Sequence, residues 1–315
     1  MPEPTFGVVL VNWNGAPDTI AALESLHAAA NTAEHVVVVD NGSAAESIDA
    51  LRAWANANAR GWVEATLGQP SATAAPWLTL ITAGRNLGFS GANNVGLTYL
   101  AATRDTHFLL LNNDAMVAPD YFVELRAMLA REPDAALVGS LILRHPERDR
   151  VWFAGGYEVP HRALVLHRLT LADAQHPHAT EFVTGCAMLI SRELYEAQGG
   201  LADVYNPIYW EDTDYSFRAR SAGWKVMMAP RARVYHRVGA SGGGESLTPR
   251  TAFLQNRNRG FYVRRNYRGR DRLVALAYLV ATKPARALVE ALRGRPKLGM
   301  ATFRGFARGV FGPLG

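Results

Sequence analysis

The chain has almost no cysteine: among its 315 residues, Cys186 is the single one. One thiol excludes a disulfide framework within the chain and fits a reducing compartment such as the cytoplasm. Cys186 also lies in the apolar run 182–190, which favours a buried structural thiol over a reactive nucleophile.

Long apolar runs and phosphate-binding glycine motifs are also missing. No run approaches the roughly 18 residues of a membrane span, and the short segment Thr5–Val11 predicts a first strand rather than a secretory signal. Neither G-x-G-x-x-G nor G-x-x-x-x-G-K-[ST] follows that strand, so a dinucleotide fingerprint and a P-loop are unsupported. We therefore expect a cytoplasmic protein, with contact at the cytoplasmic face of the membrane left open.

Acidic residues are scarce in the last part of the chain. From Arg250 onward, arginine and lysine far outnumber the two acids, Asp271 and Glu290. The whole chain carries only +5, so residues 1–249 are net acidic. Such a basic tail suits nucleic acid, anionic lipid or a phosphorylated substrate, but a solvated helical surface has the same composition.

What is present indicates a parallel α/β sheet. Apolar, β-branched runs at Phe6–Asn12 and His35–Asp40 flank a helical pattern at 18–30, for which Asp18 is a candidate cap. Near-continuous valines predict strands buried on both faces. Further strands are predicted at 77–81, 108–111, 137–143 and 182–191, with helices at 91–103, 120–131, 192–198, 250–267 and 270–293. The interval 144–180 predicts hairpins and loops.

Polar clusters follow four of the predicted strands. They are the segments 12–15, 40–43, 85–94 and 112–114. Turn chemistry explains one such cluster, but four at the carboxyl edge of a sheet indicate a ligand site. Asp40 suits the imide N–H of uracil or thymine, or ribose hydroxyls. Asp114 suits a hard divalent cation that bridges phosphates.

A second cluster joins three acids to two large aromatic residues. Glu211, Asp212 and Asp214 follow Tyr209 and Trp210 directly. Partial burial beside apolar rings raises a carboxylate's pKa, as a general base requires. A helix over residues 213–222 capped by Asp212 would also favour acids in its first turn. These residues alone leave both interpretations open.

Together these segments resemble family 2 glycosyltransferases, most closely the rhamnosyltransferase-like branch with a GT-A fold. The resemblance covers about residues 5–267 and rests on the segments 8–14, 39–43, 86–96, 109–114, 184–190, 199–200, 211–218 and 223–224, with Arg-Asn-Arg at 257–259 and a basic pair at 264–265. It implies a GT-A catalytic domain at 1–248, with a nucleotide-sugar half at about 1–115 and an acceptor half at about 116–248. A helical basic extension follows at 249–315.

The resemblance also implies residue roles. Asn112-Asn113-Asp114 occupies the D-x-D place, so Asp114 is implied as ligand of Mg²⁺ or Mn²⁺, completed by His236. Asp212 matches the catalytic base, with Glu211 as an acceptor-orienting or backup carboxylate. Trp210 stands where smaller residues are frequent and is expected to narrow the acceptor site. The candidate nucleotide-sugar contacts are Asn12, Asn14, Asp40, Asn41, Asn86, Gly88, Asn94, Asn112, Asn113 and Arg257.

The implied activity is inverting transfer of a sugar from dTDP-rhamnose or a UDP-sugar to a glycan or polyprenyl-linked acceptor, in cell-surface polysaccharide synthesis. The alternatives are a nucleotidyltransferase and a non-catalytic polyanion-binding module. Nucleic acid is not expected as a partner, because the basic tail lacks interleaved aromatics and the acidic N-terminal part would repel phosphate. The apolar stretch Leu273–Val280 either lies on an anionic membrane or packs on the catalytic domain or a second subunit of a homodimer.

Overall fold

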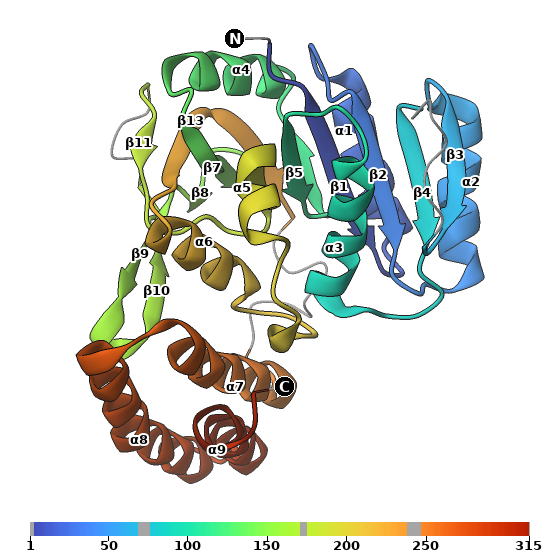
Figure 1. Ribbon diagram of the computed structural model, residues 1–315. Helices are drawn as coiled ribbons and strands as arrows, with labels where there is room; N and C mark the ends of the chain where they lie inside the picture. The colour runs from blue at the N-terminus through green and yellow to red at the C-terminus, as the bar shows by residue number, and fades with distance from the viewer. Residues whose placement is uncertain (1–2, 69–75, 171–174, 238–246, 315) are drawn as a thin grey trace.

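The computed structural model describes residues 3–68, 76–170, 175–237 and 247–314. Its centre is an 11-stranded mixed sheet in the order β11-β13-β7-β12-β5-β1-β2-β4-β3, with β6 and β8 at its side (Figure 1). The strands are β1 Phe6–Asn12, β2 His35–Asp40, β3 Trp62–Thr66, β4 Leu78–Thr82, β5 His107–Leu111, β6 Ala115–Val117, β7 Ala135–Arg144, β8 Val151–Phe153, β11 His178–Ala179, β12 Ala187–Ser191 and β13 Lys225–His236. A separate hairpin pairs β9 Gly156–Val159 with β10 Leu164–His167.

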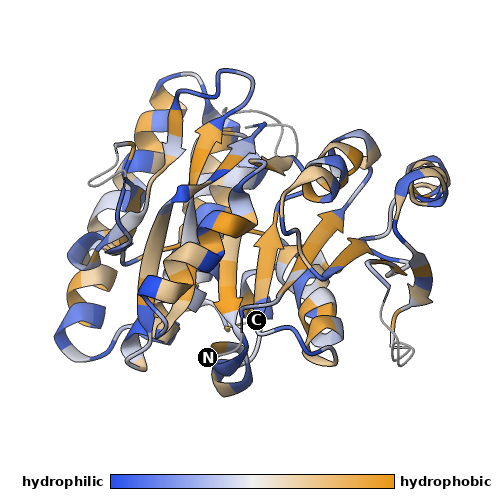
Figure 2. Ribbon diagram, turned by 90° about the horizontal axis from the view of Figure 1, so that it is seen from above, coloured by the Kyte–Doolittle hydropathy of each residue, from blue (hydrophilic) through white to orange (hydrophobic). Residues whose placement is uncertain are grey.

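Helices cover both faces of this sheet. They are α1 Ala16–Ala28, α2 Ala45–Asn58, α3 Gly88–Ala101, α4 Tyr121–Arg131, α5 Arg192–Gln198 and α6 Glu211–Ser221. Alternate β1 side chains explain the two cores: Val8 packs with α1, α2 and α4, whereas Val9 packs with α3, α5 and α6. Figure 2 shows the apolar central strands between these helices. The predicted α/β class is confirmed.

Strand direction places the carboxyl ends of β1, β2, β4 and β5 at one edge. These strands pair in parallel, with Asn12 beside Asp40 and Asp40 beside Thr82 in the register. β12 runs antiparallel between β5 and β7, and β13 runs parallel to β7. The four polar clusters that follow these strands therefore lie together at the carboxyl edge of the sheet, as predicted.

Several predicted elements need correction. The chain also forms α2 and β3, which the apolar pattern did not indicate. The first helix begins at Ala16 after an N-cap at Gly15, so Asp18 lies inside the first turn and is not the cap. The interval 144–180 contains the β9–β10 hairpin as predicted, together with β8 and a 3₁₀ turn at Pro160–Arg162.

Three helices form a further layer against the α/β part: α7 Pro249–Asn266, α8 Gly269–Leu292 and α9 Pro296–Phe311 (Figure 1). α9 was not predicted. It crosses α7 so closely that a Cβ at Gly260, Gly305 or Gly309 would overlap backbone of the facing helix, and glycine at these positions permits the approach. α8 runs continuously through Pro284. Within the described ranges, no helix is long and apolar enough to cross a membrane.

The stretch 273–280 of α8 has two different sides. Ala275 and Leu279 are buried in a core with residues of α7 and α9, whereas Leu273 and Val280 are exposed. One side of this helix thus packs on the protein, while the other remains available to solvent or to a partner.

Candidate active site

Asn12 and Asp40 form a buried pair at the ends of β1 and β2. The Asn12 amide donates to Asp40 Oδ1 at 2.8 Å, and its Oδ1 accepts from the Thr19 hydroxyl at 2.9 Å. Asp40 Oδ2 accepts from the backbone N–H of Ser43 at 3.1 Å. These bonds fix the orientation of a carboxylate whose neighbours are neutral donors, as recognition of a base or ribose requires.

Hydrogen bonds connect the residues that follow β2 with those that follow β4, through Asn41, Asn86 and Gly88. Asn41 Oδ1 accepts from Leu87 N–H at 2.7 Å, and its amide donates to Asn86 Oδ1 at 3.3 Å. Asn86 Oδ1 also accepts from Gly88 N–H at 2.8 Å. Gly88 has φ +76° and faces the Asn206 side chain so closely that a Cβ would overlap it, which requires glycine.

The other predicted donor contacts occupy different surroundings. Asn14 is exposed and accepts from Ala44 N–H at 2.8 Å, while the Asn113 amide donates to Thr19 at 3.0 Å. Asn112 follows β5, where its N–H donates to the Cys186 carbonyl at 2.9 Å. The Asn94 side chain instead bonds both the N–H and the carbonyl of Leu201, each at 2.8 Å. Asn94 therefore joins α3 to the segment at Leu201, and its predicted contact with the nucleotide sugar stays a prediction.

Asp114 and His236 meet although they are far apart in the sequence. β6 pairs with β13 so that Ala115 lies opposite His236, and this register brings Asp114 Oδ1 to 3.1 Å from His236 Nε2. Both residues are buried. Burial lowers the pKa of His236, but contacts with Cys186 and Asp114 outweigh it and raise that pKa to about 10.

These two side chains fit a divalent cation that keeps few protein ligands. A carboxylate oxygen and an imidazole nitrogen lie side by side at the edge where the diphosphate of a nucleotide is expected. In the part of the chain that the structure describes, no cluster of three or more histidine, cysteine or acidic groups could hold a metal. Substrate phosphates and water would therefore supply the remaining ligands, and the metal would displace a proton from His236.

The carboxylate pair lies at the N-terminus of α6. This helix begins at Glu211 and its N-cap position is Trp210, so the alternative of Asp212 as cap is wrong. Asp212 Oδ2 accepts from Gly185 N–H at 3.0 Å, and Oδ1 accepts from Thr213 N–H at 2.7 Å. Acids in this first turn also interact favourably with the helix dipole.

The two carboxyl groups have different proton affinities. Burial, and then the charge of Asp212, raise the pKa of Glu211 to about 8. Burial also raises the pKa of Asp212, but the N–H groups of Gly185 and Thr213 oppose it by stabilising the charged form. Glu211 Oε2 is buried without a hydrogen-bond partner among the described residues. Burial thus favours the protonated form of Glu211, while the two N–H bonds to Asp212 favour the charged form of that carboxyl group.

A strained loop precedes these acids. Tyr209 and Trp210 both have left-handed backbones, with φ of +80° and +81°, which is unfavourable for bulky residues. The fully buried Asn258 of α7 stabilises this loop by donating to the carbonyls of Tyr205, Ile208 and Tyr209 at 2.7, 2.9 and 2.9 Å. The sequence placed Asn258 in a motif but did not indicate this role.

Arg257 contacts the same loop from α7. Its guanidinium donates to the backbone carbonyls of Tyr205 and Asn206 and lies near the rings of Phe253 and Phe261. In this arrangement Arg257 positions the loop, and its predicted contact with the diphosphate stays a prediction.

Asp214, the third acid of the cluster, is part of a buried network. Its oxygens accept from the Tyr205 hydroxyl at 2.9 Å and from Arg218, Arg265 and Asn266 at 2.8, 3.2 and 2.8 Å. Because Arg265 and Asn266 belong to α7, these hydrogen bonds to Asp214 connect α6 with the helical extension. A charge satisfied by two arginines is not available as a base.

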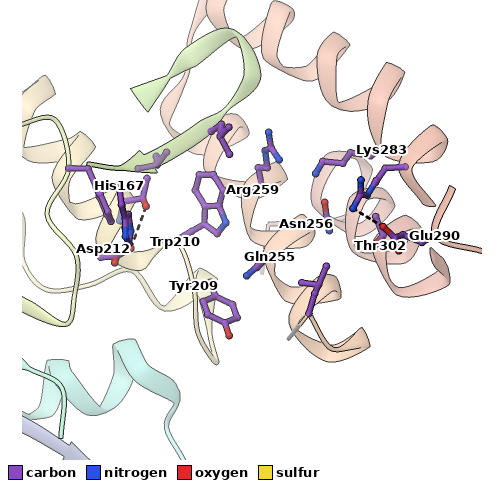
Figure 3. Close-up of a pocket in the computed structure, with 16 residues that line it drawn as sticks. His167, Tyr209, Trp210, Asp212, Gln255, Asn256, Arg259, Lys283, Glu290 and Thr302 are labelled. Atoms are coloured by element: carbon purple, nitrogen blue, oxygen red, sulfur yellow. Dashed lines mark hydrogen bonds and ion pairs between the residues drawn. The ribbon is translucent and has the colours of Figure 1, made fainter. Parts of the chain in front are cut away.

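A cavity of about 400 Å³ opens beside Asp212. Figure 3 shows His167 and Asp212 at one end, Trp210 and Arg259 in the middle, and Lys283 and Glu290 at the other end. Trp210 lines this cavity. Its predicted narrowing of the acceptor site stays a prediction. His167 of β10 was not predicted; burial lowers its pKa, although Asp212 opposes the effect.

A sequence profile described as glycosyltransferase-like family 2 matches residues 2–268. The chain belongs to this family. It is 21% identical over 160 residues to the dTDP-rhamnosyl transferase RfbF of Shigella flexneri, an alignment covering 51% of the chain and 52% of RfbF. The chain spans between 21% and 56% of the length of the curated relatives it matches.

Two solved structures share the fold. GalNAc-T7, determined with UDP, GalNAc and Mn²⁺, matches with a TM-score of 0.64 at 15% identity, covering 97% of this chain and 54% of that one. The mannosyltransferase PcManGT of Pyrobaculum calidifontis, determined with GDP-Man and Mn²⁺, matches with a TM-score of 0.57 at 16% identity, covering 99% and 88%. The fold of this family member is thus the GT-A fold, as expected from its sequence.

Proposed function

We propose that this family 2 glycosyltransferase transfers a sugar from a nucleoside-diphosphate sugar to an acceptor hydroxyl with inversion at the anomeric carbon. The observation that carries the proposal is the unequal carboxyl pair of α6. Asp212 lines the cavity and accepts N–H bonds from Gly185 and Thr213, while burial raises the pKa of the adjacent Glu211. A carboxylate oriented in this way at a cavity can take up the proton of an acceptor hydroxyl.

In the proposed reaction, Asp212 accepts the proton of the acceptor hydroxyl. The acceptor oxygen forms a bond to the anomeric carbon as the bond from that carbon to the diphosphate oxygen breaks, so the nucleoside diphosphate leaves with the bonding electrons. The transition state has oxocarbenium character, as in glycoside hydrolysis. A bound Mg²⁺ or Mn²⁺, held by Asp114 and His236, would neutralise charge on the leaving diphosphate.

For the donor we propose dTDP-rhamnose or a UDP-sugar. The buried Asp40 oxygen beside Asn12 suits the imide N–H of thymine or uracil, or a ribose hydroxyl. Asn41, Asn86 and Gly88 would shape the same subsite, with Asn14, Asn112 and Asn113 nearer the phosphates. The identity to RfbF is consistent with a dTDP-linked sugar. Thermal shift with a panel of nucleotide sugars and Mg²⁺ or Mn²⁺ would identify the donor.

For the acceptor we propose a glycan or polyprenyl-linked saccharide of a cell-surface polysaccharide, reached by a cytoplasmic protein at the membrane face. The exposed surface of α8 and α9 supports this, because it combines large apolar side chains with cations. The exposed apolar residues are Leu288, Leu292, Phe303 and Phe311, and the exposed cations of the same segment include Arg293, Lys297 and Arg304. A homodimer contact is the competing use of that surface.

Asp212→Asn tests the proposed base. Asparagine keeps the shape of the side chain but cannot take the proton, so transfer should fall by about 10²- to 10⁴-fold while donor binding stays unchanged. Glu211→Gln is the matched control, because glutamine mimics the protonated Glu211 and should retain most activity. If Glu211→Gln is the more damaging change, the two roles are reversed.

A further inference from the structure

The cavity beside Asp212 extends well beyond the GT-A domain. Its lining comes from Tyr209 and Trp210, from the first turn of α6 and from β10, but also from all three helices of the extension: Gln255, Asn256 and Arg259 of α7, Lys283, Arg286 and Glu290 of α8, and Thr302 of α9. Asp212 thus lies at one end of a cavity whose other end is lined by residues of α7, α8 and α9 (Figure 3).

The charges at that far end do not cancel. Glu290 is 1% exposed and pairs with Arg286 at 2.7 Å and with Arg295 at 2.6 Å, so two arginines already neutralise it. Arg259 donates to the backbone carbonyl of Arg162, which carries no charge. Lys283 has no hydrogen bond or ion pair with any other described residue.

The surroundings of Lys283 disfavour its charged form. It is half-buried, and burial first, then the charges of Arg259 and Arg286, lower its pKa to about 7. A cation that is partly desolvated beside other cations destabilises the free protein, unless something else supplies negative charge. Such groups in a cavity are characteristic of binding sites.

We propose that this far end binds a phosphate group of the acceptor, with Lys283 and Arg259 as its main ligands. Several positive charges around one neutralised carboxylate suit a phosphate or diphosphate better than a single carboxylate. The hydroxyl that becomes glycosylated then reaches Asp212 while the phosphate is held by α7 and α8. This inference rests on the proposed function, since it names the acceptor chemistry of the same site.

The phosphate has two sources: a lipid-linked acceptor, or a soluble sugar phosphate. Both place the same anion against Lys283, and they differ only in what is attached to it. Two probes separate them, glucose 1-phosphate for the soluble source and a long-chain alkyl phosphate below its micellar concentration for the lipid source.

Calorimetric titration of the full chain with each probe tests the site. Lys283→Met should weaken binding of at least one probe about 10- to 100-fold, the loss typical of one charge-assisted hydrogen bond. Methionine fills the same space without charge, so the variant should fold at least as well, which a thermal melt checks. Lys283→Arg should retain most of the affinity. Arg131→Met, an exposed change at the end of α4 outside the cavity, should leave it unchanged.

The outcomes separate the site from the function. Binding that survives Lys283→Met, or is lost on Asp114→Ala instead, overturns the inference, because the probe then occupies the donor site or none. If Asp212→Asn abolishes transfer while Lys283→Met leaves probe binding and the acceptor KM unchanged, the proposed function stands and the phosphate site falls. If probe binding depends on Lys283 but no sugar transfer is found, the site stands and the proposed function falls.

Discussion

Replacing Glu211 by glutamine should change how stability depends on pH. In the folded protein the pKa of Glu211 is raised to about 8, from 4.5 for a solvated glutamate. Between these values the folded state binds one more proton than the unfolded state, so stability falls as pH rises, by about 1.4 kcal/mol per pH unit. Over the whole interval the loss reaches at most about 5 kcal/mol.

Glutamine cannot ionise and presents nearly the same shape as the protonated acid. Glu211→Gln should therefore match the wild type near pH 5 and become progressively more stable than it towards pH 8.5. The charge of Asp212 contributes to the raised pKa of Glu211. The variant Asp212→Asn should therefore have a lower Glu211 pKa, so that its stability stops falling at a lower pH than that of the wild type.

Urea unfolding of wild type and Glu211→Gln at pH 5, 6, 7, 8 and 9 measures the difference directly. The expected result is a gap that opens with pH and levels off above about 8. Two stability curves that stay parallel across this range would show that Glu211 ionises normally, and the unequal carboxyl pair on which the base assignment rests would be refuted.

Two further predictions concern the metal and the membrane. Asp114→Ala should abolish the stabilisation of the protein by nucleotide sugar plus Mg²⁺ or Mn²⁺ in a thermal shift assay, whereas the exposed Asp271→Ala should not; equal donor binding with and without EDTA in Asp114→Ala would disprove the metal assignment. The intact chain should sediment with anionic vesicles at low salt and release them as salt is raised. Leu292→Asp, at a side chain 78% exposed on α8, should weaken this binding, while Leu169→Asp, 61% exposed outside the extension, should not. Absence of vesicle binding at low salt would exclude the membrane surface.

The sheet edge was predictable because parallel strands put their carboxyl ends together. The polar clusters that follow β1, β2, β4 and β5 therefore located Asn12, Asp40 and Asp114 from the sequence alone. Asp114 and His236 are separated by 122 residues, and only the pairing of β6 with β13 brings them together. Their association was implied by the family resemblance and not by spacing.

Other parts left no periodic signal. β3 is an edge strand with mostly exposed side chains, and α2 buries only Leu51, Trp54 and Ala55, so neither shows a continuous apolar pattern. The glycines within α9 are more typical of a loop than of a helix, but in the structure they allow close contact with α7. The role of Asn258 depends on three backbone carbonyls about 50 residues away, and no local pattern reveals such a contact.

The crossing of α9 on α7 also determines when the site can form during synthesis. The strained 205–210 loop depends on Asn258, and α7 is packed against α9 through Gly260, Gly305 and Gly309. A nascent chain with its whole GT-A sheet already outside the ribosome still lacks these supports until residue 311 has emerged. The strand edge that carries Asn12 and Asp40 can therefore fold while translation continues, whereas the cavity beside Asp212 is completed only after α9 has been made.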